Sequence, residues 1–107
     1  MRKVFLIPDT TKIEAYKVSL EVERYLRDHL VLPLWSLEGF TGCELEPCEF
    51  ATLLGGDGFI MRKSLEVGRA GIPFVAINFG EKGFLAVAEK DNWQEVLEKV
   101  LNGRYVI

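Results

Sequence analysis

The chain has 107 residues, a formal net charge of -3 and a pI of about 5.2, and 49% of its residues are hydrophobic. This length fits one domain, and this hydrophobic content suffices for a folded core. The acidic balance excludes the basic face of a typical nucleic-acid-binding protein. No apolar run approaches the roughly 20 residues that span a membrane, and the N-terminus lacks a signal-peptide pattern, so we expect a cytoplasmic protein with no membrane segment.

The first third of the chain predicts a strand, a helix and a second strand. The apolar run at 4–7 is typical of a buried strand. The T-x-x-E sequence at 11–14 has the form of a capping box, which predicts a helix start. Apolar residues then recur at three- and four-residue steps, with His29 on the same inner stripe near the helix end, which predicts about five helical turns. The second strand, at 30–35, contains Pro33, which favours the edge of a sheet or a strand start.

Strands and helices then alternate around two glycine-rich segments. A strand at 50–54 leads into Gly-Gly-Asp-Gly at 55–58, and a helix follows at 59–70. A further strand at 72–77 leads into a turn-rich loop at 78–83.

The chain closes with a short extended piece at 84–88 and a helix that has Asp91 as its N-cap and ends at Gly103. Continuous apolar strands that alternate with helices predict a parallel sheet covered on both faces. In such sheets ligands bind at the carboxyl ends of the strands. Both glycine loops follow apolar strands directly, so we expect them at the same edge.

The turn at 55–58 is the most informative feature. A buried strand that ends in glycines and opens a helix places free N–H groups and a positive helix end at one point, which suits a phosphate. A phosphate would repel the carboxylate of Asp57, which is better suited to a hydroxyl proton or a metal ion. The alternatives are structural: Asp57 only caps the helix, and Gly55, Gly56 and Gly58 only permit a tight turn.

This turn resembles the signature of the NAD kinase family, within the wider superfamily of diacylglycerol kinases, sphingosine kinases and phosphofructokinase. The segment GIPFVAINFGEKGFL at 71–85 is similar to the family's G-I-P strand followed by N-x-G-x-x-G-F-L, and the spacing between the two motifs also fits. The resemblance covers residues 50–90 well and the first 35 residues in element order only. With the element order, it implies an α/β fold: a Rossmann-like three-layer domain with a mostly parallel sheet and helices on both faces.

The resemblance also implies a chemistry. Family members transfer a phosphoryl group from ATP, or from polyphosphate, to the 2′-hydroxyl of the adenosine ribose of NAD, which gives NADP. Mg²⁺ or another divalent metal accompanies the phosphates. By this resemblance Asp57 is the base toward that hydroxyl, and Phe84 lies near the adenine. The nucleotide- and phosphate-binding residues that it implies are Gly55, Gly56, Gly58, Asn78, Gly80, Gly83 and Phe84.

Some of these residues also have plain structural interpretations. Asn78 is alternatively a turn residue with left-handed geometry, and Phe84 a core residue. Arg62, one turn into the helix at 59–70, is a further candidate for a phosphate or is simply solvated. Cys43 and Cys48 form no CxxC pair and have no nearby histidine, so we assign no protein metal ligands and expect free thiols. The alternative is a local disulfide between them, if the source is a hyperthermophile.

The chain departs from the family pattern in three places. Phe59 stands where the family usually has Thr or Ser, and Ala86 and Val87 precede any acid after the second motif. The sequence ends at Ile107, about where the family's second, β-rich domain with its Asn-Glu motif would begin. We therefore expect residues 1–107 to be the N-terminal domain of an NAD kinase, and a homo-oligomer because uncovered apolar surface favours association. The alternatives are a non-catalytic nucleotide-binding or oligomerisation module, and a lipid-kinase-like domain.

Overall fold

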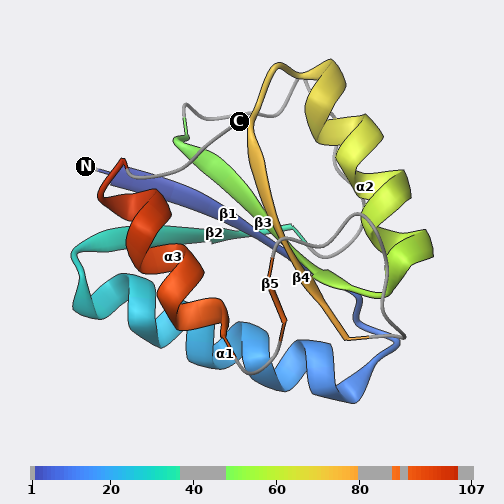
Figure 1. Ribbon diagram of the computed structural model, residues 1–107, viewed down its shortest axis with the longest axis horizontal. Helices are drawn as coiled ribbons and strands as arrows, with labels where there is room; N and C mark the ends of the chain where they lie inside the picture. Colours follow the sequence, from blue (N-terminus) through green and yellow to red (C-terminus); the bar gives the residue numbers. More distant parts are fainter. Residues whose placement is uncertain (1, 37–47, 80–87, 90–91, 104–107) are drawn as a thin grey trace.

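The structure is a computed structural model that describes residues 2–36, 48–79, 88–89 and 92–103 (Figure 1). Within these residues five strands form one sheet in the order β2-β1-β3-β4-β5, and each neighbouring pair is parallel. The strands are β1 (Arg2–Pro8), β2 (Val31–Trp35), β3 (Phe50–Gly55), β4 (Phe74–Asn78) and β5 (Ala88–Glu89), and the helices are α1 (Ile13–Asp28), α2 (Asp57–Arg69) and α3 (Trp93–Leu101).

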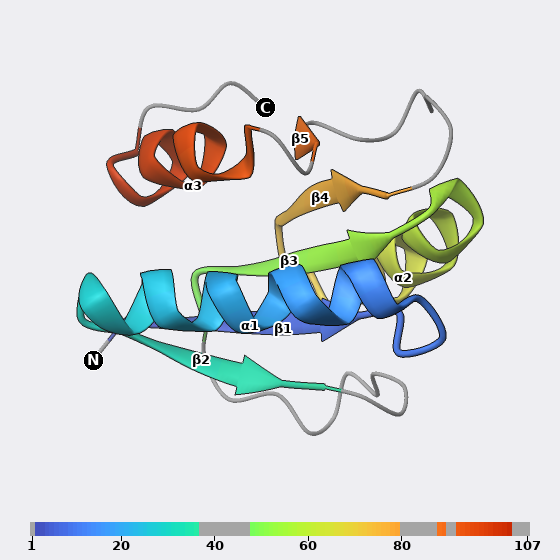
Figure 2. The same ribbon diagram turned by 90° about the horizontal axis from the view of Figure 1, so that it is seen from below.

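The sheet lies between two helical layers, so the predicted three-layer α/β fold is confirmed. Helices α1 and α3 cover one face, and α2 covers the other (Figures 1 and 2). Successive residues of β1 serve opposite faces: Val4 and Leu6 pack with α1 and α3, whereas Phe5 and Ile7 pack with α2. A strand buried on both sides has no room for polar side chains, which explains its continuous apolar run.

Strand β2 is at the edge of the sheet, as Pro33 predicted. A proline lacks the N–H that an inner strand would use, so it is tolerated where one side of the strand has no partner. The half-buried Trp35 at the end of β2 donates its indole N–H to Glu23 of α1 across 2.6 Å. This bond ties the edge strand to its covering helix.

The predicted capping box at the start of α1 is wrong. The N-cap is Lys12, and its side chain makes no capping hydrogen bond. The hydroxyl and N–H of Thr11 instead donate to one carboxylate oxygen of Asp9, at 2.6 and 3.0 Å. This turn uses the side chain that the capping box needed, and aspartate is well suited to accept such bonds.

Two other helix ends also differ from the prediction. His29 is the exposed C-cap of α1, not part of its buried stripe, and its Nδ1 lies 2.8 Å from the carbonyl oxygen of Tyr25. The N-cap of α3 is Asn92 rather than Asp91, and its side chain makes no capping hydrogen bond. Gly71 and Gly103 follow α2 and α3 with φ of 75° and 73°, as expected for residues that end a helix in left-handed geometry.

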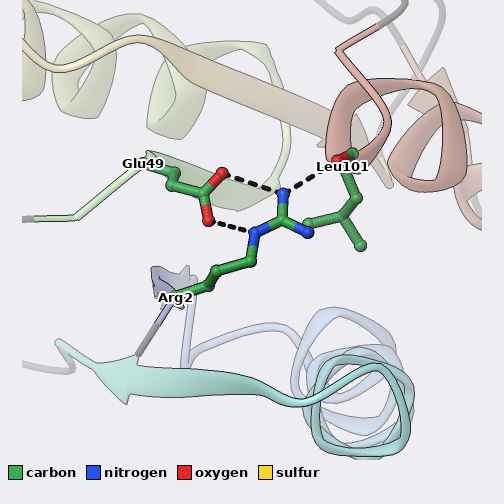
Figure 3. Close-up of polar contacts among 3 residues, drawn as sticks. All are labelled: Arg2, Glu49 and Leu101. Atoms are coloured by element: carbon green, nitrogen blue, oxygen red, sulfur yellow. Dashed lines mark hydrogen bonds and ion pairs between the residues drawn. The ribbon is translucent and has the colours of Figure 1, made fainter.

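A clamp at the amino end of the sheet joins three segments (Figure 3). The Arg2 guanidinium donates to both carboxylate oxygens of Glu49, at 2.6 and 2.9 Å, and to the carbonyl oxygen of Leu101 at 2.8 Å. It therefore connects the start of β1, the residue before β3 and the last turn of α3. The hydrogen bond from Arg2 lowers the pKa of the Glu49 carboxyl below its ordinary value.

Candidate active site at the carboxyl edge of the sheet

The turn between β3 and α2 opens the helix earlier than the sequence predicted. Gly55 ends β3, Gly56 is the N-cap with φ -85° and ψ 178°, and Asp57 is the first residue of α2. Among the described residues, no side chain makes a capping hydrogen bond to α2. The interpretation of Asp57 as a helix cap is therefore wrong, and the first-turn N–H groups of α2 have no side-chain cap.

The carboxylate of Asp57 is instead held from the neighbouring strand. Asn78 donates its side-chain N–H to Asp57 Oδ1 across 2.9 Å. Asn78 is the last residue of β4 and pairs in register with Gly55, and the N–H of Phe79 donates to the carbonyl oxygen of Gly55 at 2.9 Å. The backbone bond from Phe79 to Gly55 thus joins the ends of β3 and β4, next to the residues that make the side-chain bond.

The burial and hydrogen bonds of Asn78 and Asp57 decide which of their side-chain atoms a ligand can reach. Asn78 is only 8% exposed, whereas Asp57 is half-buried. Asn78 has strand geometry, so its interpretation as a left-handed turn residue is wrong. The bond occupies Oδ1 of Asp57, and within the described residues no hydrogen bond involves Oδ2. Asn78 therefore fixes the orientation of a carboxylate whose second oxygen can accept a proton from a ligand.

The three glycines of the turn have different structural roles. A Cβ on Gly55 would lie 2.6 Å from Cδ2 of Phe59, which is buried in the core under α2. Gly55 is therefore required by the close packing of Phe59 on the strand end. A Cβ on Gly56 or Gly58 would come no closer than 3.5 or 3.8 Å to its nearest neighbour, which is ordinary contact. Packing among the described residues does not require glycine at these two positions.

Two exposed cations flank this turn. The side chain of Lys12 lies against Gly56, with Nζ 3.6 Å from the place of a Cβ, and Nη1 of Arg62 lies 3.8 Å from the place of a Cβ on Gly58. Neither cation forms an ion pair with another described residue. Lys63 points elsewhere, because it pairs with Glu66 at 3.1 Å and lies 5.8 Å from the centre of the Phe59 ring.

Sequence reasoning named Asp57, Asn78 and Arg62 as candidates but not Lys12, which the structure places at the same turn. The available signal was its position in the loop after β1. In a parallel sheet this loop leaves the same edge as the turns after β3 and β4. Figures 1 and 2 both place the loop between β1 and α1 beside the start of α2.

The other candidate residues Gly80, Gly83 and Phe84 lie outside the described residues, and so does Cys43. Cys48 is a half-buried free thiol whose pKa is raised by burial. The described residues contain no group of three or more His, Cys, Asp or Glu side chains that could hold a metal ion. Over the same part of the chain, no helix has the length and apolar character to cross a membrane.

These features define a Rossmann-like α/β domain with a glycine-aspartate turn at the carboxyl edge of its parallel sheet. Residues 38–105 match the sequence model of the ATP-NAD kinase N-terminal domain. This match covers more than half of the chain, so the chain belongs to the ATP-NAD kinase family.

Individual relatives agree with this assignment. NAD kinase 2 of Streptomyces coelicolor is 38% identical over 63 residues, which cover 59% of this chain and 21% of the relative. NAD kinase of Natranaerobius thermophilus is 32% identical over all of this chain and 41% of its own length. The bifunctional NADP phosphatase/NAD kinase of Methanocaldococcus jannaschii is 34% identical over 90% of this chain and 18% of its own length. The chain thus spans less than half the length of these relatives.

Proposed function

We propose that this chain is the N-terminal domain of an NAD kinase and that it carries the base of the reaction. The reaction transfers a phosphoryl group from ATP or polyphosphate to the 2′-hydroxyl of the adenosine ribose of NAD. The observation that carries the proposal is the hydrogen bond from Asn78 to Asp57 Oδ1, which holds a carboxylate at the carboxyl edge of the sheet. The family match and the relatives named NAD kinase support this choice of substrate.

In the proposed step, Oδ2 of Asp57 accepts the proton of the 2′-hydroxyl. The hydroxyl oxygen forms a bond to the terminal phosphorus of the donor, and the bond from that phosphorus to the bridging oxygen breaks. ADP leaves when ATP is the donor. Phosphoryl transfer depends mainly on position and charge neutralisation, so a rigidly held base suits it. Asn78 supplies this rigidity because its amide keeps Oδ1 occupied.

The phosphates of the donor would lie at the start of α2. The uncapped N–H groups there, the positive helix end and Arg62 all favour an anion. Gly56 and Gly58 leave the backbone open to a ligand, which explains glycine where packing does not require it. In the same proposal Gly80 and Gly83 contact the nucleotide and Phe84 lies near the adenine, as the family resemblance implies.

A divalent metal, Mg²⁺ in the usual case, would accompany the donor and neutralise charge on its phosphates. The described residues fit an ion carried mainly by phosphates, because they offer one carboxylate at the turn and no cluster of three metal ligands. Magnesium is commonly held this way, by one or two carboxylates and the substrate phosphates. Asp57 is the residue of this site that would face the ion.

A second domain would supply the rest of the NAD site in this proposal, which agrees with the greater length of the relatives. Association into a homo-oligomer and a cytoplasmic location are parts of the same proposal. If the chain binds nucleotide without turnover, it is a binding module. Phosphorylation of diacylglycerol without phosphorylation of NAD would make it a lipid kinase.

The proposal is tested by a coupled assay for NADP from ATP, Mg²⁺ and NAD. It is run on the chain alone and on the longest natural protein that contains it. Asp57→Asn keeps the size of the side chain but removes the base, so we expect turnover to fall by about 10²- to 10⁴-fold. Asp28→Asn, at the far end of α1, is the matched control and should leave turnover unchanged. Undiminished turnover in Asp57→Asn would refute the proposed base.

A further inference from the structure

Lys12 occupies a position that is unfavourable in the absence of a ligand. It is the N-cap of α1, where Ser, Thr, Asp, Asn or Gly is preferred and where a cation faces the positive helix end. Its side chain crosses to the N-cap of α2, where Nζ lies 3.6 Å from the place of a Cβ on Gly56. The ammonium group therefore stands near the positive ends of two helices.

Lys12 is exposed and forms no ion pair with another described residue. Arg62, on the other side of the turn, adds a second cation beside Gly58. Asp57, at the same turn, has Oδ1 bonded to Asn78. Local conflicts of this kind are typical of functional sites, and an anion bound between Lys12 and Arg62 would offset the unfavourable placement of these two cations.

The backbone that carries Lys12 is fixed to the end of β3. Asp9 donates its N–H to the carbonyl oxygen of Leu54 at 2.8 Å, and Lys12 donates its own N–H to the carbonyl oxygen of Asp9 at 3.0 Å. The two bonds from Thr11 to the Asp9 carboxylate tighten the same turn. The position of Lys12 opposite Gly56 is therefore set by the fold, and only its flexible side chain must adjust to a ligand.

We infer that Lys12 binds the phosphate chain of the phosphoryl donor, with Arg62 on the opposite side of that chain. This inference rests on the proposed function, because it assigns a new residue to the same site. The donor is favoured over the NAD pyrophosphate, since the phosphates next to Asp57 must be those that approach the hydroxyl it deprotonates. The chemistry that Lys12 recognises is a linear triphosphate or longer polyphosphate, which ATP and inorganic polyphosphate share.

The test is a titration of the 107-residue chain with inorganic tripolyphosphate, with ATP and Mg²⁺, and separately with NAD, by calorimetry or NMR. Lys12→Met removes the charge and keeps an unbranched chain, Lys12→Arg keeps the charge, and Lys17→Met is a control on an exposed lysine of the same helix. One charged hydrogen bond at an exposed site corresponds to about a five- to tenfold change in Kd. We expect Lys12→Met to weaken the binding of tripolyphosphate and of ATP by this factor. Lys12→Arg and Lys17→Met should keep the wild-type affinity.

A second readout separates charge from structure. The Kd of tripolyphosphate should rise with salt, and it should rise less steeply in Lys12→Met because one screened charge is gone. Equal affinity and equal salt dependence in Lys12→Met and the wild type would overturn the inference, and so would failure of the wild type to bind tripolyphosphate. Weakened binding of NAD alone would assign Lys12 to the NAD pyrophosphate and would also overturn it. If all variants bind ATP but neither NAD nor tripolyphosphate, the assignment of Lys12 to the phosphate chain is contradicted. The proposed function is tested separately, because it fails if Asp57→Asn does not lower turnover.

Discussion

Asn78 and Asp57 lie 21 residues apart in the sequence, yet the side-chain amide of Asn78 reaches Asp57 Oδ1 at 2.9 Å. The two residues meet because each stands at the carboxyl end of adjacent parallel strands, one as the last residue of β4 and the other just after β3. The bond brings one residue from each of the two glycine-rich segments together. It also gives Asn78 a defined role, which is to position the carboxylate of Asp57.

Loss of the Asn78 amide should slow turnover without abolishing it. Asn78→Ala leaves Asp57 in place but frees its carboxylate to rotate. One hydrogen bond to a charged group is worth about 1.5–3 kcal/mol, so we expect a roughly ten- to 150-fold lower kcat in the coupled NADP assay. Asn102→Ala, at the C-terminal cap of α3, is the control and should keep wild-type kcat. A kcat in Asn78→Ala equal to that of the wild type would mean that Asp57 does not depend on Asn78.

The two glycines at 55 and 56 should respond differently to alanine. Gly55→Ala must displace Phe59 from a well-packed core, so we expect the free energy of unfolding in urea to fall by about 1–3 kcal/mol. Gly56→Ala has an ordinary φ of -85° and room for the methyl group, so stability should change by less than about 0.5 kcal/mol while ATP binding weakens.

A double-mutant cycle checks the cause of the Gly55 effect. Phe59→Thr removes the ring that the new methyl group would meet, so Gly55→Ala should cost less in the Phe59→Thr background than in the wild type. Equal costs in the two backgrounds would show that the ring is not the cause.

The clamp at the opposite end of the sheet should make stability depend on acid pH. The folded-state pKa of Glu49 lies below its ordinary value of 4.5, so its contribution is present above that value and is lost as pH falls through the folded pKa. In Glu49→Gln the free energy of unfolding should therefore depend less on pH below about pH 5. The difference should be about 1 kcal/mol or less, because the Arg2–Glu49 pair is partly exposed. Glu21→Gln, on the exposed side of α1, should leave the curve unchanged, and an unchanged curve in Glu49→Gln would contradict a role for the clamp.

The clamp should also hold the last turn of α3. Arg2→Met removes the donor to the Leu101 carbonyl, so amide hydrogen exchange near the end of α3 should speed up while exchange in α2 stays the same. Uniform exchange changes in both helices would point to a global loss of stability instead.

The order of elements and the parallel sheet could be predicted because buried strands such as β3 are continuous apolar runs and glycines end α2 and α3. The helix starts could not, since they depend on competition among nearby polar groups. Thr11 begins a T-x-x-E pattern that predicts a helix cap, but its hydroxyl donates a hydrogen bond to Asp9 instead. The place of Asp57 was predictable from its motif. The approach of the Lys12 side chain to Gly56 brings two loops together and leaves no local pattern in the sequence.

The most direct test of the site is an NMR titration of the isotopically labelled chain with NAD, and separately with ATP and Mg²⁺. We predict that the amide signals of residues 55–58 and of Asn78 shift with nucleotide, while those of Arg2 and Leu101 at the opposite end of the sheet do not. An absence of shifts at millimolar nucleotide, or shifts confined to another part of the chain, would contradict a nucleotide site at Asp57 and Asn78.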